Sequence, residues 1–348
     1  MPNAPTSRRA YAKLNLMLSV GQALPAEHEK AGYHPICSWF SCIDLFDDIT
    51  VEPSKGTASK YNITWADNAV RKSDIDWPIE KDLAVRAHKA LEALTNKPLP
   101  ITLTLHKRIP VGGGLGGGSS DAAACLLAVR KAFSLDIEDD ALRDIAMTLG
   151  SDVAFFLDDE NQSSDDTNTA ARSAIVSGLG EVIERVEAFD YPIILVVPHF
   201  GCATGAVYKS FDETLEAELR EYRLDRAVAA EHGQNLGRER STGPREQMVQ
   251  GRVERMIRER KLDTDLLFSD LAKPAFAVEP RLGQLVTNLS NVTRSAAHVT
   301  GSGSCVFLVP RRGKEDWMLE RVHRVCDTLG SEPDFGGTPA VIVTKLIG

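Results

Sequence analysis

The sequence lacks a long apolar run, an apolar N-terminal core and any closely spaced pair of cysteines. A helix that crosses a bilayer needs roughly 18 consecutive apolar residues, so we expect no membrane span. The opening residues, MPNAPTSRRAYAK, do not resemble a signal peptide. The six cysteines show no C-x-x-C spacing. That absence favours buried thiols in the reducing cytoplasm over disulfides or a zinc site.

Acidic residues outnumber basic residues. The chain has 40 Lys and Arg against 49 Asp and Glu, a net charge of −9, so we expect no nucleic-acid partner. Hydrophobic residues at 43% and charged residues at 26% are ordinary for a globular protein. The length of 348 residues is enough for two domains. We predict that they span residues 1–189 and 190–348.

Glycine, in contrast, is concentrated in one block. Residues 110–124 read PVGGGLGGGSSDAAA, and the preceding ITLTL (101–105) alternates like a strand. Glycine lets backbone N–H groups approach a ligand closely, and the start of a helix adds unpaired N–H donors. The order strand, glycine loop, helix therefore predicts an anion site, most naturally for nucleotide phosphates.

Three other interpretations of this block are weaker. A P-loop requires a lysine after the glycines, and none follows. A dinucleotide fingerprint needs an acidic residue about twenty positions on, after a second strand, whereas residues 125–145 have a helical pattern. A flexible glycine linker would not be flanked tightly by a strand pattern and an apolar helix.

The rest of the chain alternates strand and helix patterns. Strands are predicted at 12–20, 48–52, 101–105, 173–178, 191–198, 295–301, 305–309 and 340–347. Helices are predicted at 81–94, 119–133, 138–149, 213–230 and 245–262. Two polar insertions, 158–172 and 231–246, are predicted to be solvated loops, although the second, rich in arginine, is also compatible with steering a substrate.

Two polar residues share one face of the first strand. By the two-residue period, Ala12, Leu14 and Leu16 lie on one side and Lys13 and Asn15 on the other. Lys13 and Asn15 could simply extend into solvent. Alternatively they face a polar cavity, where an ammonium would stabilise a transferring phosphoryl group.

Asp152 stands in TLGSDVAFFL, between a glycine-serine turn and an apolar run. Such an aspartate is often only a cap. If it projects towards Lys13, it could orient or deprotonate an attacking hydroxyl, and the lysine would keep it ionised.

Two further segments are candidates for ligand contact. HVTGSGSCVFLV (298–309) is a second turn of small residues, which either forms an ordinary hairpin or closes on the same ligand as the first. In AGYHPICSWF (31–40), Tyr33, His34 and Phe40 could enclose a planar base, or they could belong to the core and surface.

Together these motifs resemble the GHMP family of small-molecule kinases. The matching segments are Ala12 to Leu16, Gly32 to His34, Pro110 to Ala123, Gly150 to Phe156 and Thr300 to Phe307. The doubled glycine block followed by Ser-Ser-Asp is most similar to the branch that acts on a cytidine diphosphate-linked methylerythritol in isoprenoid synthesis. The resemblance implies ATP-dependent phosphorylation of the 2-hydroxyl of that compound. It also implies an α/β (α+β) fold with an ATP-binding N-terminal domain like domain 2 of ribosomal protein S5 and a ferredoxin-like C-terminal domain.

The resemblance also implies roles for individual residues. Lys13 and Asp152 match the catalytic pair. ATP would lie on Pro110, Val111, Gly112, Gly113, Gly114, Leu115, Gly116, Gly117, Gly118, Ser119 and Ser120. Mg²⁺ would come with the ATP phosphates, with Ser120 as a candidate ligand. The substrate would contact Asn15, Tyr33, His34, Phe40 and Tyr208.

The chain departs from the family pattern in places. The segment before Tyr33 is longer (GQALPAEHEKAGYH), and Ala154 replaces a usual proline. Alternatives are a family kinase acting on another small alcohol, a non-catalytic ligand sensor and a decarboxylase variant. A monomer or a homodimer is expected.

Overall fold

The computed structural model describes residues 4–158, 169–187, 189–231 and 243–348, with side chains omitted for 220–231. The first half contains β1 (Thr6–Val20), β2 (Ile36–Pro53), β3 (Lys60–Trp65), α1 (Leu83–Thr95), β4 (Ile101–Lys107), α2 (Gly117–Ala132), α3 (Asp139–Leu149), β5 (Ala174–Gly178) and β6 (Val182–Arg185). The second half contains β7 (Pro192–Val197), α5 (Thr204–Glu231), α6 (Glu246–Glu259), β8 (Phe268–Ser269), α7 (Ala272–Val278), α8 (Pro280–Thr293), β9 (His298–Val299), β10 (Val306–Leu308), α9 (Glu315–Gly330) and β11 (Ala340–Ile347). Short 3₁₀ turns lie at Ile79–Lys81, Ala154–Phe156 and Thr264–Leu266. The mixed α/β fold class predicted from the sequence is confirmed.

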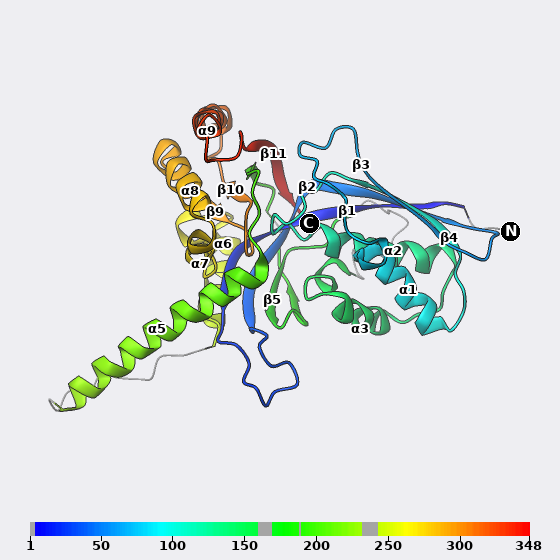
Figure 1. Ribbon diagram of the computed structural model, residues 1–348, viewed down its shortest axis with the longest axis horizontal. Coiled ribbons are helices and arrows are strands. Elements are labelled where there is room, and N and C mark those ends of the chain that lie inside the picture. Colours follow the sequence, from blue (N-terminus) through cyan, green and yellow to red (C-terminus); the bar gives the residue numbers. More distant parts are fainter. Residues whose placement is uncertain (1–3, 159–168, 188, 232–242) are drawn as a thin grey trace.

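One continuous sheet connects both halves of the molecule (Figure 1). Its strands run in the order β3-β4-β2-β11-β7-β10-β9, and β1, β5, β6 and β8 join at the sides. The long strand β2 pairs with β4 near its end, with β11 at Cys42 and Ile43, and with β5 near its start. The antiparallel partner β1 follows β2 along nearly its whole length. The β1–β2 hairpin therefore carries the elements of both halves.

The predicted strand at 12–20 is confirmed, but β1 begins earlier and is irregular. Its pairing register with β2 shifts between Tyr11 and Lys13 and again between Asn15 and Met17. Such bulges twist a strand and redirect its side chains. Both faces of this segment are buried, and Lys13 and Asn15 are only 3% and 4% exposed. The interpretation that these two residues extend into solvent is wrong.

Three helices cover the sheet in the first half. α1 begins at Asp82, whose carboxylate accepts hydrogen bonds from the N–H groups of Ala84 and Val85. The alanine-rich α2 is buried along most of its length because its small side chains allow close approach to β1 and β2. α3 packs beside it through Leu142 and Ala146. This core fixes the start of α2 against the end of β4.

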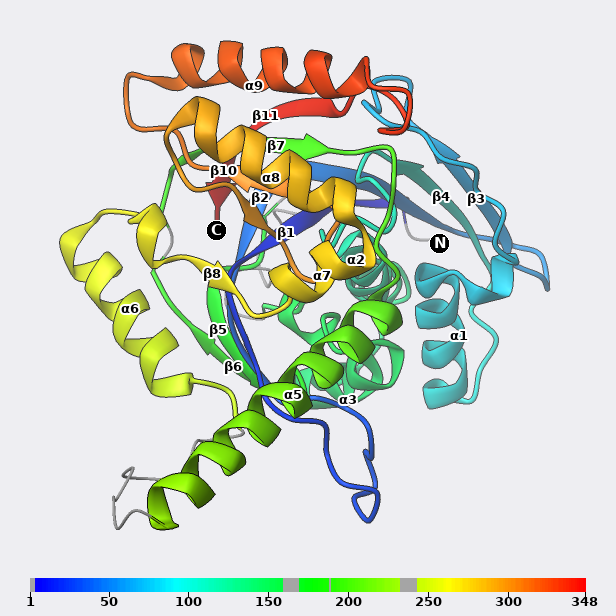
Figure 2. The ribbon, with the colours of Figure 1, turned by 60° about the vertical axis from the view of Figure 1, so that its left-hand side comes forward.

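In the second half β7 is covered on both faces. Ile194 and Val196 pack with α8 and α9, which lie across one side of the sheet in Figure 2. Ile193, Leu195 and Val197 pack with residues of α6 and of the β1–β2 hairpin. A strand that is buried on both faces has a continuous run of apolar residues. This is why the sequence predicts a strand at 191–198.

Strand pairing crosses residue 189, the expected domain boundary. β11, from the end of the chain, pairs with β2, and β8 pairs with β1. The boundary itself stays a prediction.

The two polar insertions lie largely outside the described residues, which omit 159–168 and 232–242. At the margins of the first, Asp158, Ala170 and Ala171 are buried, so the prediction of a solvated loop is wrong for these positions. Asp158 is held there by an ion pair with Arg172, at 2.8 Å. Within the described residues, no helix combines the length and apolar character needed to span a membrane.

Candidate active site

The glycine block forms the connection from β4 to α2, as predicted. Gly116 stands at the N-cap of α2 with φ +70°, and no side chain caps the helix in the structure. The first helical bond is donated by Ser120 N–H to the Gly116 carbonyl, at 2.9 Å. The N–H groups of the helix start therefore remain available to an anion. The linker interpretation is wrong, because Gly113 and Leu115 are buried in the fold.

The second glycine turn, 300–304, packs directly on the first. Cys305 N–H donates to the Gly113 carbonyl at 3.2 Å, and the Thr300 hydroxyl lies 3.5 Å from the Gly114 carbonyl. Gly114 has φ +78°, and a side chain there would overlap the Thr300 carbonyl. The glycine at 114 is thus required both by its backbone conformation and by this close approach.

Lys13 and Asp152 meet beside these turns. The Lys13 Nζ lies 3.2 Å from Asp152 Oδ2, and the lysine is buried whereas the Asp152 side chain is 28% exposed. The lysine is also anchored through its backbone, because its N–H donates to the Leu115 carbonyl at 2.9 Å. An ammonium and a partly exposed carboxylate are therefore held together next to the glycine loop.

Asp152 is not a helix cap. It follows Gly150, which ends α3, and precedes the 3₁₀ turn at Ala154–Phe156, which has no side-chain cap. Its carboxylate instead accepts a 3.3 Å hydrogen bond from the Ser151 hydroxyl and faces Lys13.

Asn15 links the lysine to the second turn. Lys13 Nζ donates to Asn15 Oδ1 at 2.5 Å, and Asn15 N–H donates to the Thr300 hydroxyl at 3.0 Å. The Asn15 amide nitrogen donates to Ser38 Oγ at 3.0 Å, and Ser38 donates to the Met17 carbonyl at 2.5 Å. The sequence interpretation missed Ser38 and Thr300 as parts of this network. Thr300 stands in the TGSGS segment, whereas nothing near Ser38 distinguishes it.

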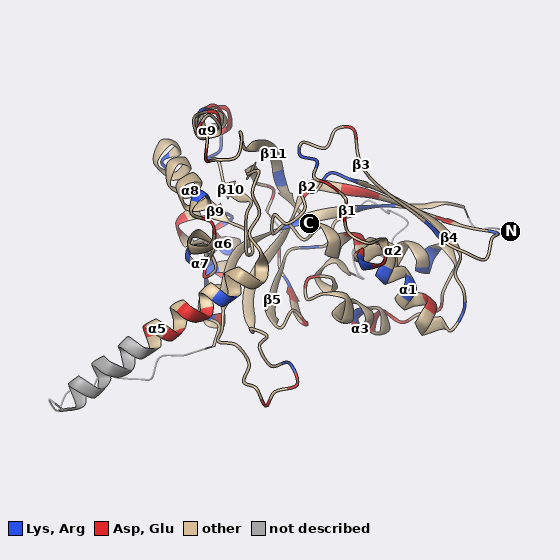
Figure 3. Cartoon of the chain, in the orientation of Figure 1, with Lys and Arg blue, Asp and Glu red and all other residues tan. Residues whose placement is uncertain are grey.

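The aromatic candidates come from the loop before β2, from β2 itself and from α5. His34 Nδ1 donates to the Gly21 carbonyl at 2.9 Å, and Nε2 lies 3.4 Å from Asp212 of α5, which carries acidic residues beyond its first turns in Figure 3. The rings of His34 and Tyr208 are 4.9 Å apart. Burial raises the pKa of Tyr208 to about 12, with a smaller contribution from the Asp152 charge. His34 is therefore fixed against α5 and not a free surface side chain.

Tyr33 and Phe40 differ in exposure. Tyr33 is 62% exposed in the loop between β1 and β2, where its carbonyl accepts a hydrogen bond from Leu24 N–H at 2.8 Å. Phe40 is buried in β2, and Lys13 Nζ lies 4.5 Å from its ring centroid. A cation over an aromatic face is attracted to the ring.

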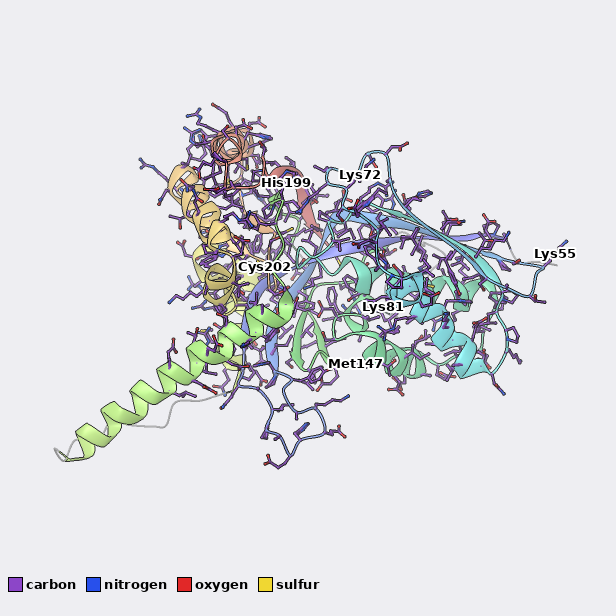
Figure 4. The ribbon with its side chains drawn as sticks, in the orientation of Figure 1. Lys55, Lys72, Lys81, Met147, His199 and Cys202 are labelled. Atoms are coloured by element: carbon purple, nitrogen blue, oxygen red, sulfur yellow. The ribbon has the colours of Figure 1, made fainter. Side chains whose placement is uncertain are left out.

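One cavity of about 1170 Å³ brings most of these residues together. Its lining includes the sequence-predicted residues Lys13, Asn15, Tyr33, His34, Phe40, Gly114, Gly116, Asp152 and Tyr208, and also Thr148, Glu181, Gly301 and Ser302. Met147 of α3 and Thr204, the first residue of α5, also line the cavity. Figure 4 labels Met147, and it labels Cys202, which lies just before α5. This volume is above the common range for a small-molecule site.

The remaining residues of the glycine block do not line this cavity. Pro110, Val111, Gly112, Gly113, Leu115, Gly117, Gly118 and Ser119 belong to the loop and helix start beside it. Ser120 is buried and lines a separate, much smaller cavity with Tyr11. Among the described residues, no three acidic, histidine or cysteine side chains gather as a metal site would need.

Comparison with known proteins identifies the class. Residues 82–159 match the family model for the GHMP kinases N-terminal domain. A solved structure of 4-(cytidine 5'-diphospho)-2C-methyl-D-erythritol kinase shares the fold, with a TM-score of 0.64 at 24% identity over 98% of this chain and 99% of that one. The chain belongs to the GHMP kinase family.

Within this family, the chain is similar to 4-diphosphocytidyl-2-C-methyl-D-erythritol kinases. It is 30% identical to that of Polaromonas sp. over 94% of this chain and 92% of the relative. It is also 30% identical to that of Chloroherpeton thalassium over 66% of this chain and 71% of the relative.

Proposed function

We propose that this kinase transfers the γ-phosphoryl group of ATP to the 2-hydroxyl of 4-diphosphocytidyl-2-C-methyl-D-erythritol, in the non-mevalonate route to isoprenoid precursors. The names of its relatives support this acceptor. The observation that carries the proposal is the 3.2 Å contact between Lys13 and Asp152 in a cavity bordered by both glycine turns. The ammonium and the carboxylate share this cavity with Gly114 and Gly116 of the first glycine turn and with Gly301 and Ser302 of the second.

Each group has a defined part in the transfer. Asp152 accepts the proton of the acceptor hydroxyl as its oxygen forms a bond to the γ-phosphorus, and the bond from that phosphorus to the β,γ-bridging oxygen breaks to release ADP. Lys13 stabilises charge on the transferring group. Asn15 orients Lys13 through their 2.5 Å hydrogen bond.

ATP is the phosphoryl donor in this proposal, with its phosphates against residues 110–120. The unpaired N–H groups at the start of α2 and the positive helix end suit phosphate oxygens. Mg²⁺ would be held mainly by those phosphate oxygens and would neutralise charge on the transferring group. Ser119 is a better candidate protein ligand than Ser120, because Ser120 is buried towards the separate small cavity, whereas the Ser119 hydroxyl lies beside Gly150.

The acceptor would occupy the part of the cavity between the loop before β2 and α5. Tyr33 is exposed there and free to stack on a base, whereas His34 and Tyr208 are fixed against each other. Asn15 and Phe40 flank Lys13 and would contact the methylerythritol. The buried state of all six cysteines supports a reducing compartment such as the cytoplasm.

A coupled ADP-release assay tests the proposal. We expect turnover with ATP, Mg²⁺ and the cytidyl acceptor, and only background rates with homoserine or mevalonate. Turnover with one of those alcohols alone would point to another activity of the family. ADP release with none of them, in a protein that binds ATP, would favour a ligand sensor.

A further inference from the structure

Asp121 is the one acidic residue of the glycine-serine motif, and the chemistry above gives it no part. It lies in the first turns of α2, is 2% exposed and does not line the cavity. Its Oδ2 accepts a hydrogen bond from Lys107 Nζ at 2.5 Å. Lys107 is the last residue of β4, so this ion pair joins the two residues that flank the glycine loop.

A second carboxylate completes a buried group that we call the Lys107 cluster, made of Lys107, Asp47 and Asp121. Asp47 Oδ2 accepts from Lys107 Nζ at 2.7 Å. Asp47 Oδ1 accepts from the backbone N–H groups of Arg108 and Ile109, the first two residues after β4. The cluster therefore holds the start of the glycine loop against β2. It also ties the end of β4 to the start of α2.

The burial of Asp121 carries a desolvation cost. The cluster buries two carboxyl groups against one ammonium, and Asp121 Oδ1 has no hydrogen-bond partner within the described residues. Burial raises the pKa of the Asp121 carboxyl well above its usual range, with Lys107 acting in the opposite direction. Removing one partner of a buried ion pair is usually destabilising, so a loss of stability in Asp121 variants would not by itself reveal a further role, and nucleotide affinity is the property to measure.

We propose that Asp121 is a positioning residue for nucleotide binding, because its bond to Lys107 sets the start of α2 relative to the end of β4. This inference rests on the proposed use of residues 110–120 for the ATP phosphates. Backbone donors recognise phosphate only when their spacing is correct, and a site that is about 1 Å too loose loses function.

The test measures ADP affinity, with Mg²⁺ and without acceptor, by isothermal titration calorimetry on the whole protein. Asp121→Ala removes the bond to Lys107, and we expect at least a tenfold weaker affinity. Asp121→Asn keeps an oxygen that can accept from Lys107, and we expect its affinity to stay within about threefold of the original. In steady-state assays Asp121→Ala should raise the KM for ATP and leave the KM for the acceptor within twofold.

The matched control is Asp158→Ala, which also removes a buried carboxylate, one that pairs with Arg172 and Arg185 outside the loop. It should lower the melting temperature and leave ADP affinity unchanged. If Asp121→Ala does not fold, Asp121→Ser, whose hydroxyl is too short to reach Lys107, carries the same expectation. Unchanged ADP affinity in folded Asp121→Ala or Asp121→Ser would overturn the positioning role. An equal loss of ADP affinity in Asp121→Asn and Asp121→Ala would also overturn it. Because no acceptor is present, a wrong acceptor assignment would leave this result intact.

Discussion

At the scale of single residues, the site depends on a lysine that the fold has removed from water. An isolated buried ammonium is costly, so Lys13 is retained only because Asp152, Asn15 and the Phe40 ring surround it. The same contacts restrict its rotamers. A charge held in advance needs little reorganisation when a phosphoryl group arrives, which is the usual source of electrostatic catalysis.

Asp152→Asn tests this arrangement. The amide keeps the size of the carboxylate but cannot take a proton from the acceptor, so we expect kcat to fall by at least about 10²-fold. ADP affinity should change little, because the proposal assigns Asp152 to the acceptor hydroxyl and the nucleotide phosphates to the backbone donors of residues 110–120. The coupled ADP-release assay measures kcat, and isothermal titration calorimetry measures ADP affinity. Near-normal turnover in this variant would refute the role of Asp152.

A second prediction concerns His298 and the pH dependence of the free energy of unfolding. Burial lowers its pKa to about 4, outweighing a backbone contact with Thr264 and the charge of Asp265, which both raise it. The folded protein therefore prefers the neutral ring, whereas the unfolded chain takes up a proton near pH 6.5. Stability from this group is present above pH 6.5 and is lost as the pH falls towards 4, by an amount on the order of 3 kcal/mol.

Urea unfolding at pH 7 and pH 4.5 measures this loss. His298→Gln has no titrating ring, so its free energy of unfolding should decline less between the two pH values than that of the unsubstituted protein. Equal declines would show that His298 does not contribute to acid sensitivity.

The sequence singles out side chains that stand in a recognisable motif, and the catalytic roles given to them stay predictions. Lys13, Asn15 and Asp152 were chosen from polar residues in apolar surroundings, and the structure brings them together. The Lys107 cluster was not predicted, because Lys107 and Asp47 are 60 positions apart in ordinary strand sequence. Ser38 was missed for the same reason, since its importance comes only from the partner strand.

At the scale of elements, the two glycine turns act as one unit. Gly112 and Gly114 both have positive φ, but only Gly114 is packed against the Thr300 turn, whereas nothing lies within 4 Å of a Cβ built on Gly112. This difference provides a matched pair of substitutions.

Gly112→Ala should cost about 1–2 kcal/mol of unfolding free energy, the penalty of a left-handed alanine. Gly114→Ala adds an overlap with the Thr300 carbonyl and should cost roughly 1–3 kcal/mol more, or displace the second turn. Denaturant unfolding of the two variants measures the difference. Equal costs would mean that the two turns do not press on each other in solution.

Element prediction was good for strong patterns and poor for mixed ones. The strand at 101–105 and helices near 81–94 and 119–133 were recovered within a few residues. β2 was placed only at 48–52, because its first half carries aromatic, cysteine and serine residues that we read as a binding segment. α8 and α9 were not predicted, and their apolar stripes have meaning only against the sheet that they cover.

At the scale of the whole molecule, the halves share too much structure to unfold separately. Leu14, Trp39 and Leu195 lie in one buried cluster, although β7 comes late in the chain. We therefore expect a single transition in calorimetry, with equal calorimetric and van't Hoff enthalpies. Two resolved transitions would instead support independent folding of residues 1–189 and 190–348.

The position of β11 has a consequence for biosynthesis. This strand fills the gap between β2 and β7, yet the ribosome makes it after every other strand of the sheet. Until it emerges, a nascent chain exposes two unpaired strand edges, and such edges invite association with other chains. Ribosome-bound intermediates of this kinase are therefore natural clients for chaperones that shield exposed β-structure.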